Sequence, residues 1–96
     1  SSKIRDIGVK IVKKILFENQ KNVVGTQLKL QRIKKGLSQS QLAAKVQTLG
    51  VSLDQQMISK IEKNDRIVTD YELACLCHVL DTTPGEMLQD FYEQYI

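Results

Sequence analysis

Long apolar runs, histidine and aromatic residues are all scarce in this 96-residue chain. No apolar run approaches the roughly 18 residues that a membrane-spanning helix needs. Charged residues punctuate positions 1–20, so no signal peptide is visible. The low aromatic content predicts a core of aliphatic side chains. Histidine occurs once, as His78, and we find no Ser-His-Asp or Cys-His arrangement and no metal-ligand spacing. Nothing therefore indicates an enzyme, a metal, a cofactor or a small-molecule substrate.

Cysteine is confined to Cys75 and Cys77, which fall in an apolar stretch with helical character. On a helix, side chains two positions apart point about 200° away from each other, because each residue turns by about 100°. The two thiols can therefore neither form a disulfide with each other nor bind one metal ion well. Free, buried cysteines are typical of a reducing compartment, so we expect a cytoplasmic protein.

Basic residues are absent from the C-terminal part of the chain. All 14 Lys and Arg lie at or before Arg66, with only five of the 11 Asp and Glu, so residues 1–66 have a net charge of +9. Residues 67–96 carry the other six acids and no base, a net charge of −6. This asymmetry favours a surface for a polyanion at one end of the molecule, although two solvated faces would show the same pattern.

Residues 1–22 are predicted to be an N-terminal extension, and residues 23–96 to form one domain. Four isoleucines in the extension recur with helical spacing over residues 3–18. The many β-branched residues in that stretch leave a strand open as the alternative. The four isoleucines are Ile4, Ile7, Ile11 and Ile15.

Five short helices joined by short loops are expected in residues 23–96, which predicts an all-α bundle. A Ser or Thr followed three residues later by Gln or Glu marks a helix start, because the two side chains can bond to each other's backbone N–H. Glycine marks a helix end, because it tolerates the left-handed conformation needed there. The starts are Ser38 with Gln41, Thr69 with Glu72, and Thr83 with Pro84 and Glu86, and Gly36 and Gly50 end the first helix (26–35) and the second.

Each helix is expected to bury one apolar stripe. The last helix is unusually aromatic for this chain, and the part of its face that does not close the core is a possible dimer contact. The inward residues are Leu28, Leu30 and Ile33; Leu42, Ala43, Val46 and Leu49; Ile58 and Ile61; Leu73, Leu76, Cys77 and Leu80; and part of the set Leu88, Phe91, Tyr92 and Tyr95.

The third helix, about 54–63, has an outer face of amides, a hydroxyl and ammonium groups. Asp54 is a good N-terminal cap for it, and Leu53 with Ile58 forms a plausible hydrophobic staple. A polar, solvated face is common on surface helices, but amides and lysine near a helix N-terminus are also the groups that recognise adenine and guanine edges. The outer residues are Gln55, Gln56, Ser59 and Lys60, which we assign to base contacts, and Lys63.

Residues from about 24 to 88 resemble the helix-turn-helix domain of Cro/C1-type regulators, also called xenobiotic-response-element-like. The matching motifs are LQRIKKG (30–36), LSQSQLA (37–43), ISKIE (58–62) and TTPGEML (82–88). The resemblance implies a five-helix, lambda-repressor-like DNA-binding bundle. It also implies sequence-specific binding of double-stranded DNA by a repressor-like transcriptional regulator, with the third helix in the major groove and two copies on neighbouring half-sites.

The resemblance also implies roles for individual positions. Gln39 matches a glutamine that meets the DNA backbone and braces the recognition helix. Arg32 and Glu62 match an ion pair that joins the first helix to the end of the third. The chain departs from the usual pattern by extra residues between the second and third helices, so Ser52 is open as an alternative cap to Asp54. Candidate phosphate contacts after the third helix are Lys63, Asn64 and Arg66.

Another class of function stays open beside DNA binding. The aromatic C-terminal helix and the acidic tail fit a protein-interaction module, such as an antitoxin or the binding partner of another regulator. The two functions can coexist in one chain. A basic face should at least bind DNA without sequence preference, so its failure to do so at low salt would favour the interaction module.

Overall fold

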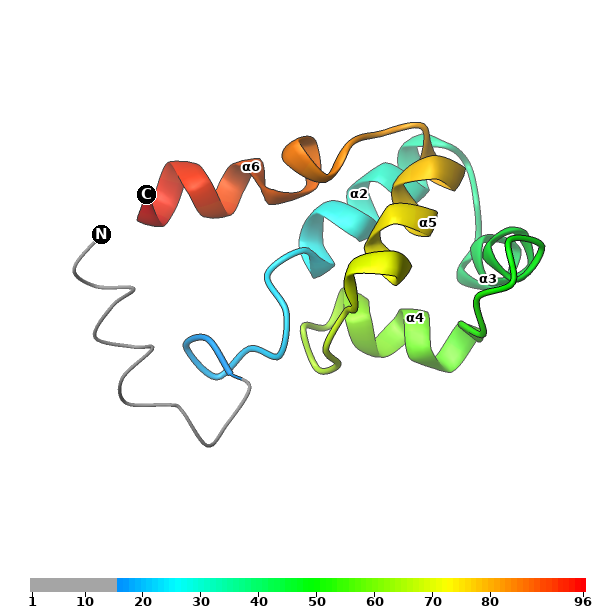
Figure 1. The fold of residues 1–96 in the computed structure, drawn as a ribbon, viewed down its shortest axis with the longest axis horizontal. Coiled ribbons are helices and arrows are strands. Elements are labelled where there is room, and N and C mark those ends of the chain that lie inside the picture. Colours follow the sequence, from blue (N-terminus) through cyan, green and yellow to red (C-terminus); the bar gives the residue numbers. More distant parts are fainter. Residues whose placement is uncertain (1–15) are drawn as a thin grey trace.

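The computed structural model describes residues 16–96 of the chain. In that range it contains five α-helices and no extended structure beyond one antiparallel bridge between Phe17 and Gln20, which confirms the predicted all-α class. None of the helices described is long and apolar enough to cross a membrane. The helices, labelled as in Figure 1, are α2 (Gly25–Lys34), α3 (Gln39–Gln47), α4 (Gln55–Glu62), α5 (Asp70–Leu80) and α6 (Pro84–Tyr95).

Helices α2 to α5 surround one aliphatic core, as the low aromatic content predicts. The N-terminal half of α6 closes this core with Met87, while its C-terminal half extends away from the other helices (Figure 1). Burying one Leu or Ile side chain contributes about 2 kcal/mol, so these few residues dominate the stability of the bundle. Fully buried are Leu28, Leu42, Val46, Leu53, Ile58, Ile61, Leu76, Leu80 and Met87.

Three of the apolar residues expected in the core are exposed. Leu30 and Ile33 on α2 are 54% and 56% exposed, because α2 packs through Leu28 and these positions lie about 200° and 140° around the helix from it. Leu49 is 44% exposed because α3 ends at Gln47, two residues before it. The core therefore depends less on α2 than the sequence indicated.

The helix boundaries follow the predicted capping residues, with two differences. Both capping boxes, Ser38 with Gln41 and Thr69 with Glu72, are complete. Thr83 accepts from the Glu86 amide as expected, but the Glu86 carboxylate accepts from the Thr82 hydroxyl and not from the Thr83 amide. The second difference is at Gly50, which was expected to end α3. It has a left-handed φ of 85° in the turn that follows the helix.

The two cysteines are free, as predicted. Cys77 is buried in the core and Cys75 is half-buried. Burial raises the pKa of the Cys77 thiol above its ordinary value, because the core disfavours the charged thiolate. The thiol of Cys77 therefore acts as a small apolar group in the packing.

The described part of the N-terminal extension, residues 16–22, is attached to the domain. Phe17 packs edge-on against Phe91 and Tyr95 of α6, with ring centroids 5.1 and 4.8 Å apart. The amide of Lys21 donates to the Asn64 carbonyl at 2.9 Å. Most of the helix or strand expected over residues 3–18 lies outside the described residues. Residues 16–22 thus pack on the same body as residues 23–96.

Candidate nucleic-acid interface

Helix α4 has the two faces that its sequence predicts. Ile58 and Ile61 are fully buried, as is Leu53 just before the helix. Asp54 is the N-terminal cap, and its carboxylate accepts from the Met57 amide at 2.8 Å, so Ser52 is not the cap. The buried isoleucines hold the opposite face outward. On that face Gln55, Gln56, Lys60 and Lys63 are exposed and Ser59 is half-buried.

A chain of hydrogen bonds runs from α4 to α3, back to α4 and then to α2. Gln55 Nε2 donates to Gln39 Oε1 at 2.7 Å, and Gln39 Nε2 donates to Glu62 Oε1 at 3.0 Å. Glu62 also accepts from Arg32 Nε at 2.7 Å and from Arg32 Nη2 at 3.1 Å. Both ends of α4 are therefore linked through Gln39 at the N-terminus of α3.

The ion pair between Arg32 and Glu62 is well shielded from water. The Arg32 side chain is 12% exposed and the Glu62 side chain 4% exposed. Arg32 Nη1 also donates to the carbonyl of Leu37 at 2.8 Å. Two parallel N–H···O bonds fix both distance and plane, so this pair sets the geometry of the α2–α4 contact. The bonds from Gln39 to Gln55 and Glu62 fit the bracing role that the resemblance implies for Gln39, whereas the bond from Arg32 to the Leu37 carbonyl was not predicted.

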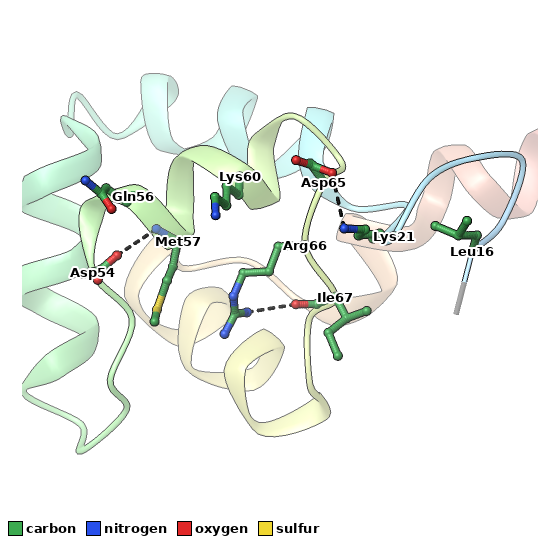
Figure 2. Close-up of a pocket in the computed structure, with 9 residues that line it drawn as sticks. All are labelled: Leu16, Lys21, Asp54, Gln56, Met57, Lys60, Asp65, Arg66 and Ile67. Carbon is green, nitrogen blue, oxygen red and sulfur yellow. Dashed lines mark hydrogen bonds and ion pairs between the residues drawn. The ribbon is translucent and has the colours of Figure 1, made fainter. Parts of the chain in front are cut away.

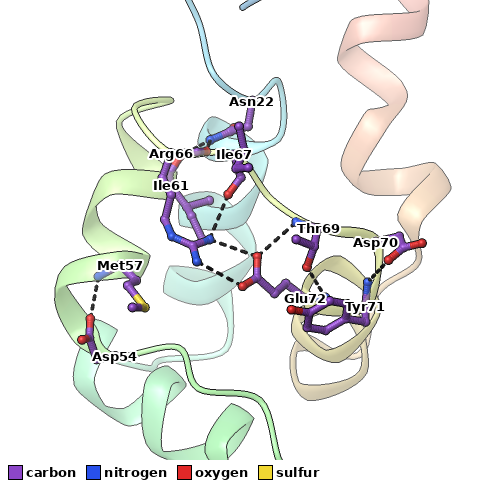
Figure 3. Close-up of polar contacts among 10 residues, drawn as sticks. All are labelled: Asn22, Asp54, Met57, Ile61, Arg66, Ile67, Thr69, Asp70, Tyr71 and Glu72. Carbon is purple, nitrogen blue, oxygen red and sulfur yellow. Dashed lines mark hydrogen bonds and ion pairs between the residues drawn. The ribbon is translucent and has the colours of Figure 1, made fainter. Parts of the chain in front are cut away.

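Arg66 and Asn64, two of the expected phosphate contacts, are bonded inside the molecule. Arg66 makes two bonds to the Glu72 carboxylate, at 3.0 and 3.1 Å, and a third to the Ile67 carbonyl at 2.8 Å (Figure 3). Asn64 Nδ2 donates to the carbonyl and to the side-chain oxygen of Asn22, both at 3.1 Å. A phosphate contact by either side chain would have to compete with these bonds, whereas Lys63 is exposed.

Glu72 holds its negative charge in a buried position. Burial by itself would raise the pKa of Glu72, but the bonds from Arg66 and from the amide and hydroxyl of Thr69 outweigh it and hold that pKa below the ordinary value. The same bond to Glu72 raises the pKa of Arg66. Because Arg66 follows α4 and Glu72 opens α5, this second ion pair fixes the loop between the two helices.

An open groove of about 730 Å³ lies along one side of α4 (Figure 2). The N-terminal segment contributes Lys21 to its wall, and Lys21 Nζ lies 3.6 Å from Asp65 Oδ1. Lys21 belongs to the N-terminal extension, for which the sequence predicted no functional role. The apolar part of the groove wall is formed by Leu16, Met57 and Ile67. Both cationic and anionic side chains line the rest, namely Lys21, Lys60, Arg66, Asp54 and Asp65.

The aromatic face of α6 is partly used within the chain. Phe91 and Tyr95 contact Phe17, and the Tyr95 hydroxyl bonds to the Glu18 carboxylate. Tyr92 is 55% exposed and Ile96, at the C-terminus, 67% exposed. Of the three residues expected at a dimer contact, Tyr92 is therefore the most open to a partner. The described residues contain no group of three or more His, Cys, Asp or Glu that could hold a metal ion.

Comparison with known protein families gives a match that covers the helix-turn-helix region. A family model described as helix-turn-helix matches residues 28–87, which is more than half of the chain. That range includes α3 and α4 with their connecting turn, but it begins after the N-terminal segment and ends before the aromatic face of α6. No curated protein and no solved structure matches the chain.

Proposed function

The chain belongs to the Cro/C1-type helix-turn-helix family of DNA-binding regulators, and from that premise we propose that it recognises a specific double-stranded DNA sequence with α4 in the major groove. The observation that carries the proposal is the α4 face itself. Its amides and ammonium groups point outward over two fully buried isoleucines, Ile58 and Ile61. A helix of this shape fits the major groove, where each base pair shows a distinct set of donors and acceptors.

Gln56 and Lys60 are the main base-contacting residues in this proposal. A glutamine can bond to adenine N6 and N7 together, and a lysine favours guanine O6 and N7. One N–H of the Gln55 amide is bonded to Gln39, so Gln55 can offer a base its carbonyl oxygen and its second N–H without giving up that bond. Ser59 is half-buried and has a short side chain, so it would contact a base only where α4 lies close to the base edges.

Lys63 and Gln39 are the proposed phosphate contacts. Lys63 is exposed directly after α4, and Gln39 lies at the N-terminus of α3, where backbone amides without helical partners favour an anion. Such contacts set the position of the protein on the duplex without recognising its sequence. Asn64 and Arg66 support the interface from inside by holding the segment after α4.

We propose that two copies bind together on half-sites about one helical turn apart. The exposed Tyr92 and Ile96 at the far end of α6 support contact between copies at that helix. Sedimentation velocity tests it: the wild type should form a dimer, and Tyr92→Ala should shift it towards the monomer. Repression of transcription is the regulatory outcome we propose for such a site.

Selection from a random duplex library tests the DNA-binding proposal directly. We expect enrichment of one motif, repeated with a two-fold relation and a spacing of about 10 base pairs. No enrichment at low salt would overturn the proposal. The same exposed end of α6 would then favour the second candidate function, a module that binds another protein.

A further inference from the structure

The start of α2 and the end of α4 meet at the side chain of Asn22. Its Nδ2 donates to the Ile61 carbonyl at 3.0 Å and to the Arg66 carbonyl at 2.8 Å (Figure 3). Its Oδ1 accepts from the amides of Val24 and Gly25 at 3.0 and 2.9 Å. One amide side chain thus bonds to the last turn of α4, the loop beyond it and the first turn of α2.

These bonds need both a donor and an acceptor on one short side chain. Ile61 lies in the last turn of α4, where its carbonyl accepts from the Asn64 amide at 2.9 Å as well as from Asn22, and Gly25 begins α2, whose first amides lack partners within the helix. Val24, at the cap position of α2, makes no side-chain cap bond, so Asn22 supplies that bond instead. Aspartate has the same shape but only acceptors, and it would set an oxygen against the two carbonyls.

The backbones of α2 and α4 come unusually close beside Asn22. A Cβ atom added to Gly25 would lie 2.3 Å from the Ile61 carbonyl oxygen, so only glycine fits there. Asn64, which has a left-handed φ of 60°, turns the chain after α4 and bonds back to Asn22. Close backbone contact and a closed set of polar bonds together fix this junction.

We propose that Asn22 is a positioning residue that fixes the direction of the C-terminal end of α4. It lies outside residues 28–87, the range that matches the family, so the segment before the matched domain takes part in orienting the recognition helix. The consequence for DNA binding rests on the proposed function. If the C-terminal end of α4 is less firmly held, Lys60 and Lys63 would shift relative to the major groove of the DNA, while the number of basic residues on the surface stays the same.

Native-state hydrogen exchange on Asn22→Asp tests the positioning role without DNA. We expect the amides of residues 61–66 to exchange about tenfold faster or more, since two bonds to carbonyls are lost, while amides in α3 keep their rates. Thr83→Ala, which removes the cap of α6 far from α4, is the matched control. Equal acceleration in α3 and α4 would mean a purely global loss of stability and would overturn the proposal. Asn22→Ala, which adds no charge, gives the same comparison if Asn22→Asp does not fold.

Binding to the selected DNA motif tests the consequence. Asn22→Ala should weaken binding to the motif about tenfold while changing binding to unrelated duplex DNA by less than about twofold. Equal weakening on both DNAs would contradict the positioning role. If the wild type selects no motif, the proposed function fails, and the exchange rates still decide the role of Asn22.

Discussion

Gln55 on the outer face of α4 donates a 2.7 Å hydrogen bond to Gln39 at the start of α3. Gln55, the first residue of α4, is therefore held by α3, the helix that we propose lies across the DNA backbone. The side chain of Gln39 is itself held in place, because its Nε2 donates a hydrogen bond to the buried Glu62 carboxylate. Helices α3 and α4 are thus linked through side-chain hydrogen bonds as well as through their packing. A substitution of Gln39 that removes its side-chain oxygen should therefore free the side chain of Gln55 from this bond.

Gln56→Ala and Lys60→Ala should each relax preference at one position of the DNA site. A lost base contact costs about 1–3 kcal/mol at that position and little elsewhere. The measurement is the relative affinity for DNAs carrying each base at each position. Lys63→Ala is the contrasting control, because it should remove one phosphate contact. It should weaken binding to all sequences alike and reduce the magnitude of the slope of log affinity against log salt concentration by about one. Unchanged base preference in both variants would show that these side chains do not recognise bases.

Arg32→Ala should destabilise the fold by about 3 kcal/mol, because it leaves the Glu62 carboxylate buried without its cation. Urea unfolding measures this. Lys35→Ala is the matched control, since Lys35 pairs with Asp81 at 3.7 Å in a pair that is 44% and 89% exposed. Such an exposed pair contributes less than about 1 kcal/mol. Similar losses in the two variants would mean that shielding the Arg32 pair adds nothing.

Gly25→Ala should destabilise the domain by about 3 kcal/mol, because the new methyl group would collide with the Ile61 carbonyl and push α2 from α4. Gly85→Ala in α6 tests the same substitution where the nearest atom is 3.7 Å away. Alanine there should be neutral or stabilise by up to about 1 kcal/mol. Chemical unfolding of both variants checks the contrast, and a tolerated Gly25→Ala would show that the helices can separate without loss.

Acid should weaken the domain partly through Glu72. Its pKa is lowered in the folded protein, so the unfolded chain holds the proton more tightly and protonation favours unfolding. The stabilisation is present above the ordinary carboxyl value of about 4.3 and is lost as pH falls through the lower folded-state value. Urea unfolding at a series of pH values should show Glu72→Gln less stable than wild type near pH 6, with the difference shrinking towards pH 3.

Glu93→Gln on the exposed side of α6 controls for the change in net charge in that series. If the difference in the free energy of unfolding between Glu72→Gln and wild type stayed constant from pH 6 to pH 3, Glu72 would not contribute to the loss of stability in acid.

The local parts of the fold could be predicted because each depends on a few neighbouring residues. Ser38 with Gln41, and Thr69 with Glu72, define helix starts within four residues, and the spacing of Ile58 and Ile61 defines which side of α4 is buried. Asp54 was identified as the cap for the same reason. These signals do not depend on how the helices pack.

The incorrect and missing parts depend on contacts between distant segments. Leu30 and Ile33 look as apolar as Leu28, and only the direction from which α4 and α6 approach α2 decides which of the three is buried. The ion pair of Arg66 with Glu72 was not predicted either: the two residues are only six positions apart, but the turn into α5 brings their side chains together. The bonds of Asn22 join residues 39 and 44 positions apart, so no local pattern points to them.

The outer half of α6 has a geometric consequence for any pair of copies that meet there. A helix of 12 residues rises about 18 Å, and its first half is anchored to the bundle by Met87. If two copies meet at the C-terminal ends of α6, the length of this helix sets the distance from that contact to α4 of each copy. Lengthening or shortening α6 by whole helical turns, which keeps the direction of its exposed face, would leave the base sequence of each half-site unchanged and alter the distance between the two half-sites.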